Sequence, residues 1–200
     1  THEPSGVGDE LRIVGHLAKV QGDPPFSLPG IGNWSTEYTV YIYGLTLSSP
    51  PNAFERHFSG GTIELWSQSP GNSPWTPTTP VSSIPALLPG QVPSTFRDGT
   101  LLLRGRFSSF TIVDWPLAFP GTFDTGNITN TDIDFIAGAR LGDLATQGRQ
   151  NNWVWNGWFK VSAPVPPGYG LLYGGKLENS VPTPVEPTTW GRIKTAFTSR

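Results

Sequence analysis

The sequence contains neither cysteine nor methionine. Without cysteine, disulfides, zinc–thiolate sites and thiol catalysis are excluded. A chain of 200 residues can still bury a substantial core, so a secreted domain of this length does not need disulfides. Position 1 is Thr rather than Met. We therefore expect that an export signal was removed and that the protein is secreted, to the extracellular space or the cell surface.

Charged residues are scarce. They make up 14% of the chain, against about 25% in a typical soluble domain, and the formal net charge is -2. A nucleic-acid-binding domain needs a basic patch, so this balance argues against a nucleic-acid partner. Long apolar runs are missing too. None approaches the roughly 18 residues of a membrane-spanning helix, so we expect no membrane span.

Turn-forming residues are abundant. The 24 glycines and 21 prolines disfavour long helices and are typical of short strands joined by turns. The aromatic content of 12% argues against general disorder. We expect an all-β fold, a β-sandwich or jelly roll, with one short helix at Ala139–Ala145 and extended terminal arms. The strand candidates are residues 11–20, 36–47, 62–66, 100–115, 122–136, 153–161 and 169–177.

The pattern predicts one domain with two flanking segments. Residues 11–179 form the β-sandwich domain, and residues 1–10, which are small and polar, indicate an N-terminal arm. Residues 180–200 combine a Pro-rich linker with an amphipathic tail.

Three local patterns refine the expected strands. Residues 67–93 hold seven prolines and predict a long irregular loop on the surface, pinned by Trp75, Leu87 and Leu88. The apolar register changes at Ser108–Ser109, which predicts a β-bulge. Strand 36–47 is apolar on both faces, so it is either central and covered on both sides, or one face meets another protein.

These features favour a non-enzymatic structural protein. We expect it to assemble with copies of itself into a surface filament or a biofilm matrix, through a terminal arm that adds to a neighbour's sheet or through strand exchange. The residues expected at this contact are Leu11, Ile13, Tyr41, Tyr43, Trp190, Ile193 and Phe197.

The alternative function is a carbohydrate-binding β-sandwich module with a polysaccharide as partner. Exposed aromatic rings can stack on sugar rings, and the candidates are Trp158 and Trp66. Trp153 and Trp155 share one strand face in a stretch of low charge, so we expect them in the core.

Acidic residues gather after the longest predicted strand. Asp132 and Asp134 are two apart and point the same way from a strand, and Asn130 lies beside them. Their oxygens could bind Ca²⁺. The alternative is a solvated polar face opposite Ile133 and Phe135. No other cofactor is expected.

No catalytic residue is predicted. The histidines His2, His16 and His57 are scattered, and the Gly-x-Ser-x-Gly pattern of a nucleophile elbow does not occur. A glycoside hydrolase that pairs Glu64 with an aspartate of the acidic cluster is a third hypothesis.

Four stretches carry a family resemblance: FSGGTIELWSQSP, DGTLLLRGRFSSFTI, GTFDTGNITNTDIDFIAGARLGDLA and VPPGYGLLYGGKLE. They resemble exported bacterial proteins of the PEP-CTERM type, a group of secreted, β-rich extracellular proteins. The resemblance implies export and a role at the cell surface or in a matrix, and it brings no catalytic residues. The sorting tail of that family places a hydrophobic span and a basic end after a Pro-Glu-Pro word, whereas Val185-Glu186-Pro187 is followed by no such span here.

Overall fold

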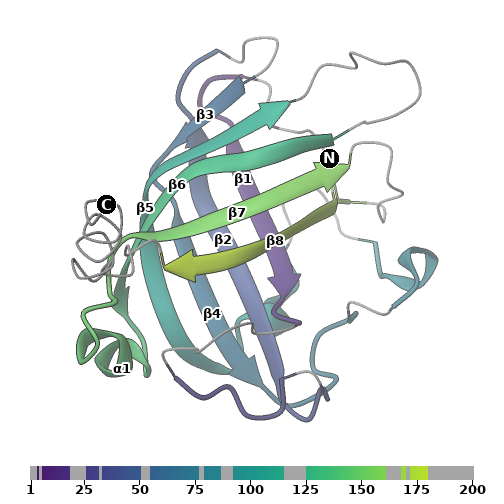
Figure 1. The fold of residues 1–200 in the computed structure, drawn as a ribbon. Coiled ribbons are helices and arrows are strands. Elements are labelled where there is room, and N and C mark those ends of the chain that lie inside the picture. The colour runs from purple at the N-terminus through teal and green to yellow at the C-terminus, as the bar shows by residue number, and fades with distance from the viewer. Residues whose placement is uncertain are drawn as a thin grey trace, which may run out of the picture.

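The computed structural model describes residues 4, 6–18, 26–31, 33–50, 55–76, 79–86, 92–114, 125–160, 168–169 and 172–179, without the side chains of some strand residues. These residues form eight β-strands, one α-helix and two short 3₁₀ helices (Figure 1). The strands are β1 (Glu10–His16), β2 (Glu37–Leu47), β3 (Glu55–Ser59), β4 (Thr62–Gln68), β5 (Thr100–Asp114), β6 (Thr125–Ala137), β7 (Trp153–Lys160) and β8 (Leu172–Asn179). The helices are η1 (Val81–Ser83), η2 (Ser94–Phe96) and α1 (Leu141–Ala145).

The strands form one antiparallel sheet in the order β1-β2-β3-β5-β6-β7-β8, with β4 also paired to β2 and β5. β3 and β4 share one register against β2, because Leu47 pairs with Phe58 and Tyr43 pairs with Thr62. They are therefore two segments of a single bent strand. The sheet is a meander in which each strand lies beside its neighbours in sequence.

Three glycines mark the bend between β3 and β4. Gly60 and Gly61 join the two segments, and Gly44 of β2 lies beside them. Their φ angles are 68°, 98° and 72° respectively, a left-handed conformation that glycine adopts without steric cost. A Cβ on Gly61 would also come within 2.5 Å of Leu45 Cδ2, so no side chain fits there.

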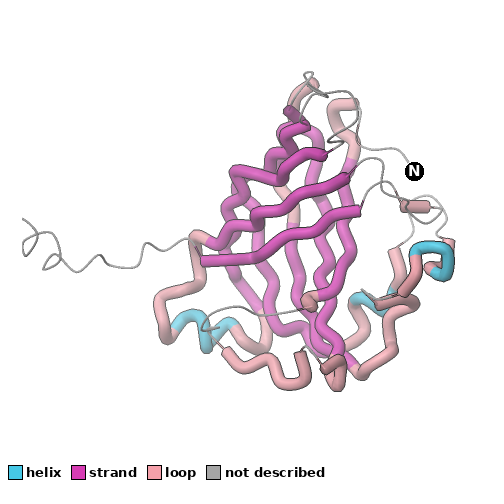
Figure 2. Tube along the Cα trace, turned by 45° about the vertical axis from the view of Figure 1, so that its right-hand side comes forward, coloured by secondary structure: helices cyan, strands magenta, loops and turns pink. Residues whose placement is uncertain are grey.

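The sheet folds over on itself. β6, β7 and β8 pass in front of β1, β2 and β4, and the turned view shows the same two groups crossing at an angle (Figures 1 and 2). The all-β, sandwich-like prediction is confirmed. Both groups supply the core, whose fully buried aliphatic side chains each contribute about 1.5–3 kcal/mol by burial. They include Ile42, Leu45, Ile63, Leu103, Ile112, Ile128 and Ile133.

α1 covers one end of this core. Its Leu144 is fully buried, and the residue before the helix, Arg140, donates its backbone N–H to the Leu102 carbonyl of β5 at 2.9 Å. The short helix expected here is confirmed. No helix within the described ranges is long and apolar enough to cross a membrane.

The predicted strands correspond to β1, β2 and β4–β8, and β3 was missed. Its sequence is largely polar, yet Arg56 and Phe58 are buried while His57 and Ser59 are exposed. Part of the predicted N-terminal arm also belongs to the sheet. Gly8 donates to the Leu47 carbonyl, and the Leu47 N–H donates to the Asp9 carbonyl, both at 2.9 Å.

The predicted β-bulge is confirmed. The β5–β6 register shifts between Phe107 and Ser109, where two steps along β5 match one step along β6. The extra residue turns the following side chain inward, so Phe107 and Phe110 are both buried. Their rings meet edge to face, with centroids 5.4 Å apart.

Candidate functional site

The candidate site lies on the outer face of β2 and β4. Side chains alternate along a strand, and the residues of these two strands that do not face the core share this face. They are Glu37, Thr39, Tyr41 and Tyr43 from β2 and Thr62, Glu64, Trp66 and Gln68 from β4. β2 is central, and its outer face is largely buried as well. Of the two alternatives predicted for this strand, the structure therefore shows the first, a central strand covered on both sides.

A buried histidine–carboxylate pair anchors one end of this face. His16 ends β1 and Glu37 begins β2, and pairing of the two strands brings them together. His16 Nε2 donates to Glu37 Oε1 at 2.9 Å, and the two side chains are 0% and 2% exposed. Among the described residues His16 Nδ1 has no hydrogen-bond partner. A proton on Nε2 therefore satisfies the one donor of the neutral ring.

Glu37 collects donors from β4 and from the turn after it. Gln68 Nε2 donates to Oε1 at 3.3 Å, and the backbone N–H groups of Asn72 and Ser73 donate to Oε2 at 3.1 and 3.4 Å. Burial acts to raise the pKa of Glu37. The hydrogen bonds from Ser73, His16 and Gln68 outweigh it and hold the pKa below its ordinary value. Glu37 is thus an anion that ties this turn to the sheet.

Aromatic rings seal the pair from outside. The His16 ring meets Trp75 and Phe96 edge to face, at centroid distances of 4.8 and 5.1 Å, and Trp34 at 6.3 Å. Burial lowers the pKa of His16 below its ordinary value and outweighs the opposite effect of Glu37. Trp75 therefore pins the long irregular segment, as predicted, whereas Leu87 and Leu88 lie outside the described residues.

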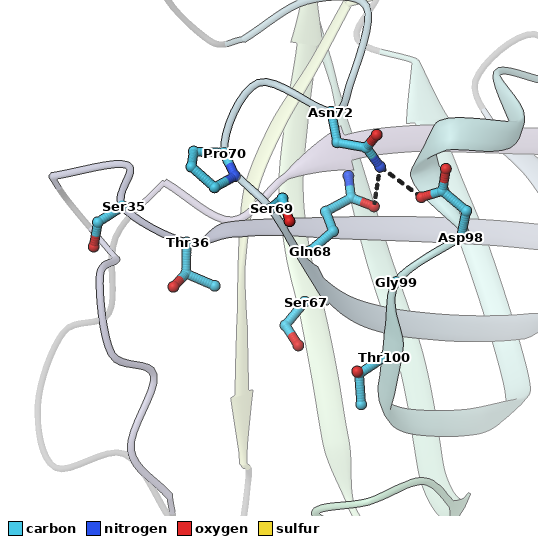
Figure 3. A pocket seen from close by; sticks show the side chains of 10 residues that line it. All are labelled: Ser35, Thr36, Ser67, Gln68, Ser69, Pro70, Asn72, Asp98, Gly99 and Thr100. Carbon is cyan, nitrogen blue, oxygen red and sulfur yellow. Dashed lines mark hydrogen bonds between the residues drawn. The ribbon is translucent and has the colours of Figure 1, made fainter.

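An open groove of about 660 Å³ is lined by Gln68 and Asn72, two of the hydrogen-bond partners of Glu37 (Figure 3). The side chain of Asn72 spans its wall and donates to Gln68 Oε1 at 3.4 Å and to Asp98 Oδ1 at 2.6 Å. Hydroxyl, amide and carboxylate groups dominate the lining, which consists of Ser35, Thr36, Ser67, Gln68, Ser69, Pro70, Asn72, Asp98, Gly99 and Thr100. Because Glu37 holds Gln68 and Asn72, the buried pair fixes the shape of the groove.

A second buried carboxylate, Glu64, lies further along the same face. It is 0% exposed and accepts four hydrogen bonds. Arg104 Nε and the Tyr43 hydroxyl donate to Oε1 at 2.9 and 3.2 Å. Arg97 Nε and Trp66 Nε1 donate to Oε2 at 3.2 and 3.1 Å. Glu64 is thus satisfied and shielded, which leaves no access for a substrate and argues against its predicted role in a hydrolase.

Four of the predicted assembly residues, Leu11, Ile13, Tyr41 and Tyr43, lie on the paired strands β1 and β2. Leu11 and Ile13 are buried in the core, at 8% and 6% exposure, because β1 packs them against the other half of the sheet. Tyr41 is buried beneath Arg97, and Tyr43 stacks on it at 4.8 Å. The side chains of Leu11, Ile13 and Tyr41 therefore offer no contact surface in the folded domain. Trp190, Ile193 and Phe197 lie outside the described residues.

The tryptophans divide as follows. Trp153 is in the core as predicted, at 7% exposure, with its ring edge-on to Phe135, and Trp155 packs against the core from one side. Trp66 is half-buried at Glu64. Trp158 lies on β7, with β5 and β6 between it and β4, and its side chain is outside the described residues.

The predicted calcium ligands lie on one strand. Asp132 and Asp134 are both on β6, and Asp134 Oδ1 accepts the Asn152 N–H at 3.4 Å. In the described part of the chain, no three His, Cys, Asp or Glu side chains gather as metal ligands. The side chain of Asn130 is outside this description, so calcium binding stays a prediction.

We predict that stability falls in two steps on acidification. The folded state lowers the pKa of His16 from 6.5 by burial, so the unfolded chain takes up the proton first, and the free energy of unfolding drops once pH falls below about 6.5. Glu37, with a pKa held below 4.5, adds a second loss below about pH 4.5. Urea titrations from pH 8 down to about pH 3 measure both. The variant His16→Gln keeps a donor but cannot titrate, so the upper step should shrink. An equal upper step in this variant would contradict the assignment.

No protein-family model, curated protein or solved structure matches this chain. What the site can do therefore follows from its own geometry.

Proposed function

We propose that this domain is a non-catalytic carbohydrate-binding module whose ligand lies in the groove beside Glu37. The observation that carries the proposal is the groove's lining, in which eight of the ten residues carry a hydroxyl, amide or carboxylate group. These groups both donate and accept hydrogen bonds, and a sugar is the ligand class that presents matching hydroxyls on every side. The family resemblance supports a place at the cell surface or in an extracellular matrix.

The buried acids and bases support binding rather than catalysis. A catalytic acid or base must reach the reacting atoms of its substrate. His16, Glu37 and Glu64 are each 0–2% exposed, and each is held by hydrogen bonds to neighbours. Their evident role is to fix the surface around them, which lowers the ordering cost of binding.

Substitution of Asn72 by Ala tests the proposal. The change removes an amide that lines the groove and braces Gln68 and Asp98. Affinity for soluble polysaccharides, measured by affinity electrophoresis and calorimetry, should fall about 3- to 10-fold, because one neutral hydrogen bond contributes about 0.5–1.5 kcal/mol.

The matched control is Asn156→Ala. Asn156 is an exposed amide on β7, outside the groove, that bonds to Glu178, so its loss should leave sugar affinity unchanged. If the protein binds no polysaccharide, or if both variants lose affinity equally, the groove is not the site.

Self-assembly is the second candidate, and one observation favours it. Within the described ranges β1 pairs only with β2, and β8 pairs only with β7, so the sheet presents two edges to which another strand could add. Light scattering of the full chain over a range of concentrations is the test. Assembly predicts a molar mass that rises with concentration, and a monomer throughout would reject it.

A further inference from the structure

Two arginines on the outer face of the sheet share one buried carboxylate. Arg97 and Arg104, called the arginine pair below, bond to opposite oxygens of Glu64 through their Nε atoms. The carboxylate is fully buried, whereas the arginine side chains are 42% and 41% exposed. Both guanidinium groups therefore lie at the surface, and both are bound to the buried carboxylate of Glu64.

The arginine pair is positioned before any ligand binds. Arg97 Cζ lies 4.7 Å above the centre of the Tyr41 ring and 5.3 Å from that of Tyr43. In the part of the chain that the structure describes, no hydrogen bond or ion pair engages the terminal amino groups of Arg97 or Arg104. Planar guanidinium forks match the two oxygens of a carboxylate, and fixed forks lose little freedom on binding.

The local charge favours an anion at this position. Two cations against the single carboxylate of Glu64 leave one positive charge in excess. Arg106, two residues beyond Arg104 on the same face of β5, is exposed but lies opposite Asp134 of β6, so these two charges offset each other and the excess rests on Arg97 and Arg104. The adjoining groove differs, because Asp98, the residue after Arg97, places a carboxylate there. A ligand that spans both regions would therefore put hydroxyls at Asp98 and an anionic group at the arginine pair.

We propose that the glycan of this site is acidic, and that a carboxylate on its sugar units binds the arginine pair. The inference rests on the proposed function and narrows it to one substrate class. A uronate polysaccharide carries ring hydroxyls, which suit the groove, and a carboxylate on the same sugar, which suits Arg97 and Arg104. Asp98, which lines the groove, directly follows Arg97 in the chain, so we place the ring hydroxyls and the carboxylate of one ligand at these two positions.

The experiment compares polygalacturonate with its methyl-esterified form, which has the same sugar backbone without the charge. Calorimetry at low salt should give about tenfold tighter binding of polygalacturonate, the gain expected for one charge-assisted contact at a half-exposed site. Arg97→Gln and Arg104→Gln should each remove about this factor for polygalacturonate and leave the esterified polymer unaffected. Lys176→Gln, which neutralises an exposed cation of β8, is the matched control and should change neither affinity.

The outcomes separate this inference from the proposed function. Equal binding of both polymers by the native chain overturns the acidic preference and leaves the groove as a neutral sugar site. Binding of neither overturns both proposals. Loss of polygalacturonate binding in the arginine variants but not in Asn72→Ala keeps the anion site and rejects the groove. Poly-glutamate separates a glycan from an acidic peptide: binding as tight as that of polygalacturonate would overturn the sugar assignment. Thermal unfolding of each variant verifies that it is folded.

Discussion

Glu37→Ala should lower the free energy of unfolding by about 3–5 kcal/mol, because the variant leaves several buried hydrogen-bond donors without an acceptor. The carboxylate accepts hydrogen bonds from His16, Gln68, Asn72 and Ser73. Its removal leaves these donors buried and unpaired, and each unsatisfied group costs about 1–3 kcal/mol. It also releases the turn that shapes the groove, so sugar affinity should fall with stability. Urea denaturation at neutral pH measures the change.

Two further variants make this test specific. Glu55→Ala removes a carboxylate that is 44% exposed and pairs with His57 at the surface, and it should change stability by less than about 0.5 kcal/mol. Glu37→Gln keeps the shape and one acceptor oxygen, so its loss should lie between the two. If Glu37→Ala is no more destabilising than Glu55→Ala, the buried pair does not hold the fold.

Phe110→Ala should destabilise the domain by about 3–5 kcal/mol, the usual cost of truncating a buried aromatic ring. Phe110 is 1% exposed. Its ring meets those of Phe58 and Phe107 edge to face at 5.8 and 5.4 Å, so the truncation leaves a cavity beside the aromatic rings of β3 and β5. Urea denaturation should show a lower midpoint with an unchanged slope.

The control for this cavity is Ile136→Ala. Ile136 is a large apolar residue on β6 but is 44% exposed, so its truncation should cost less than about 0.5 kcal/mol. Similar losses in the two variants would show that the bulge does not aim Phe110 into the core.

Local patterns sufficed to predict most strands. Apolar and polar residues alternate over Thr100–Asp114 and Trp153–Lys160, and neighbouring residues alone reveal this alternation. The bulge at Ser108–Ser109 is revealed in the same way, because the apolar residues change there from odd to even positions. The sequence of β3 contains no such apolar pattern. Its composition is largely polar and does not indicate that Arg56 is buried. That burial depends on pairing with β5, where Arg56 lies opposite Ile112, a residue far along the chain.

The site could not be predicted in the same way. The site forms where β1, β2 and the turn after β4 converge, which brings together His16, Glu37 and Ser73. The residues next to His16 in the sequence give no indication that Glu37 is its partner. Glu64 left no signal either, because a carboxylate between Ile63 and Leu65 is what strand alternation places on a solvent-facing side. Its burial depends on Arg104, which the neighbouring strand β5 supplies.

The bend at Gly44, Gly60 and Gly61 has a consequence for how this sequence can change over evolution. The strand segments on either side tolerate many β-forming residues, because their role is to alternate between core and surface. The three glycines do not, since their backbone angles and the contact with Leu45 exclude a side chain. A distant relative that keeps this fold should thus retain a Gly-Gly pair and the single glycine of the preceding strand, long after its apolar residues have been exchanged.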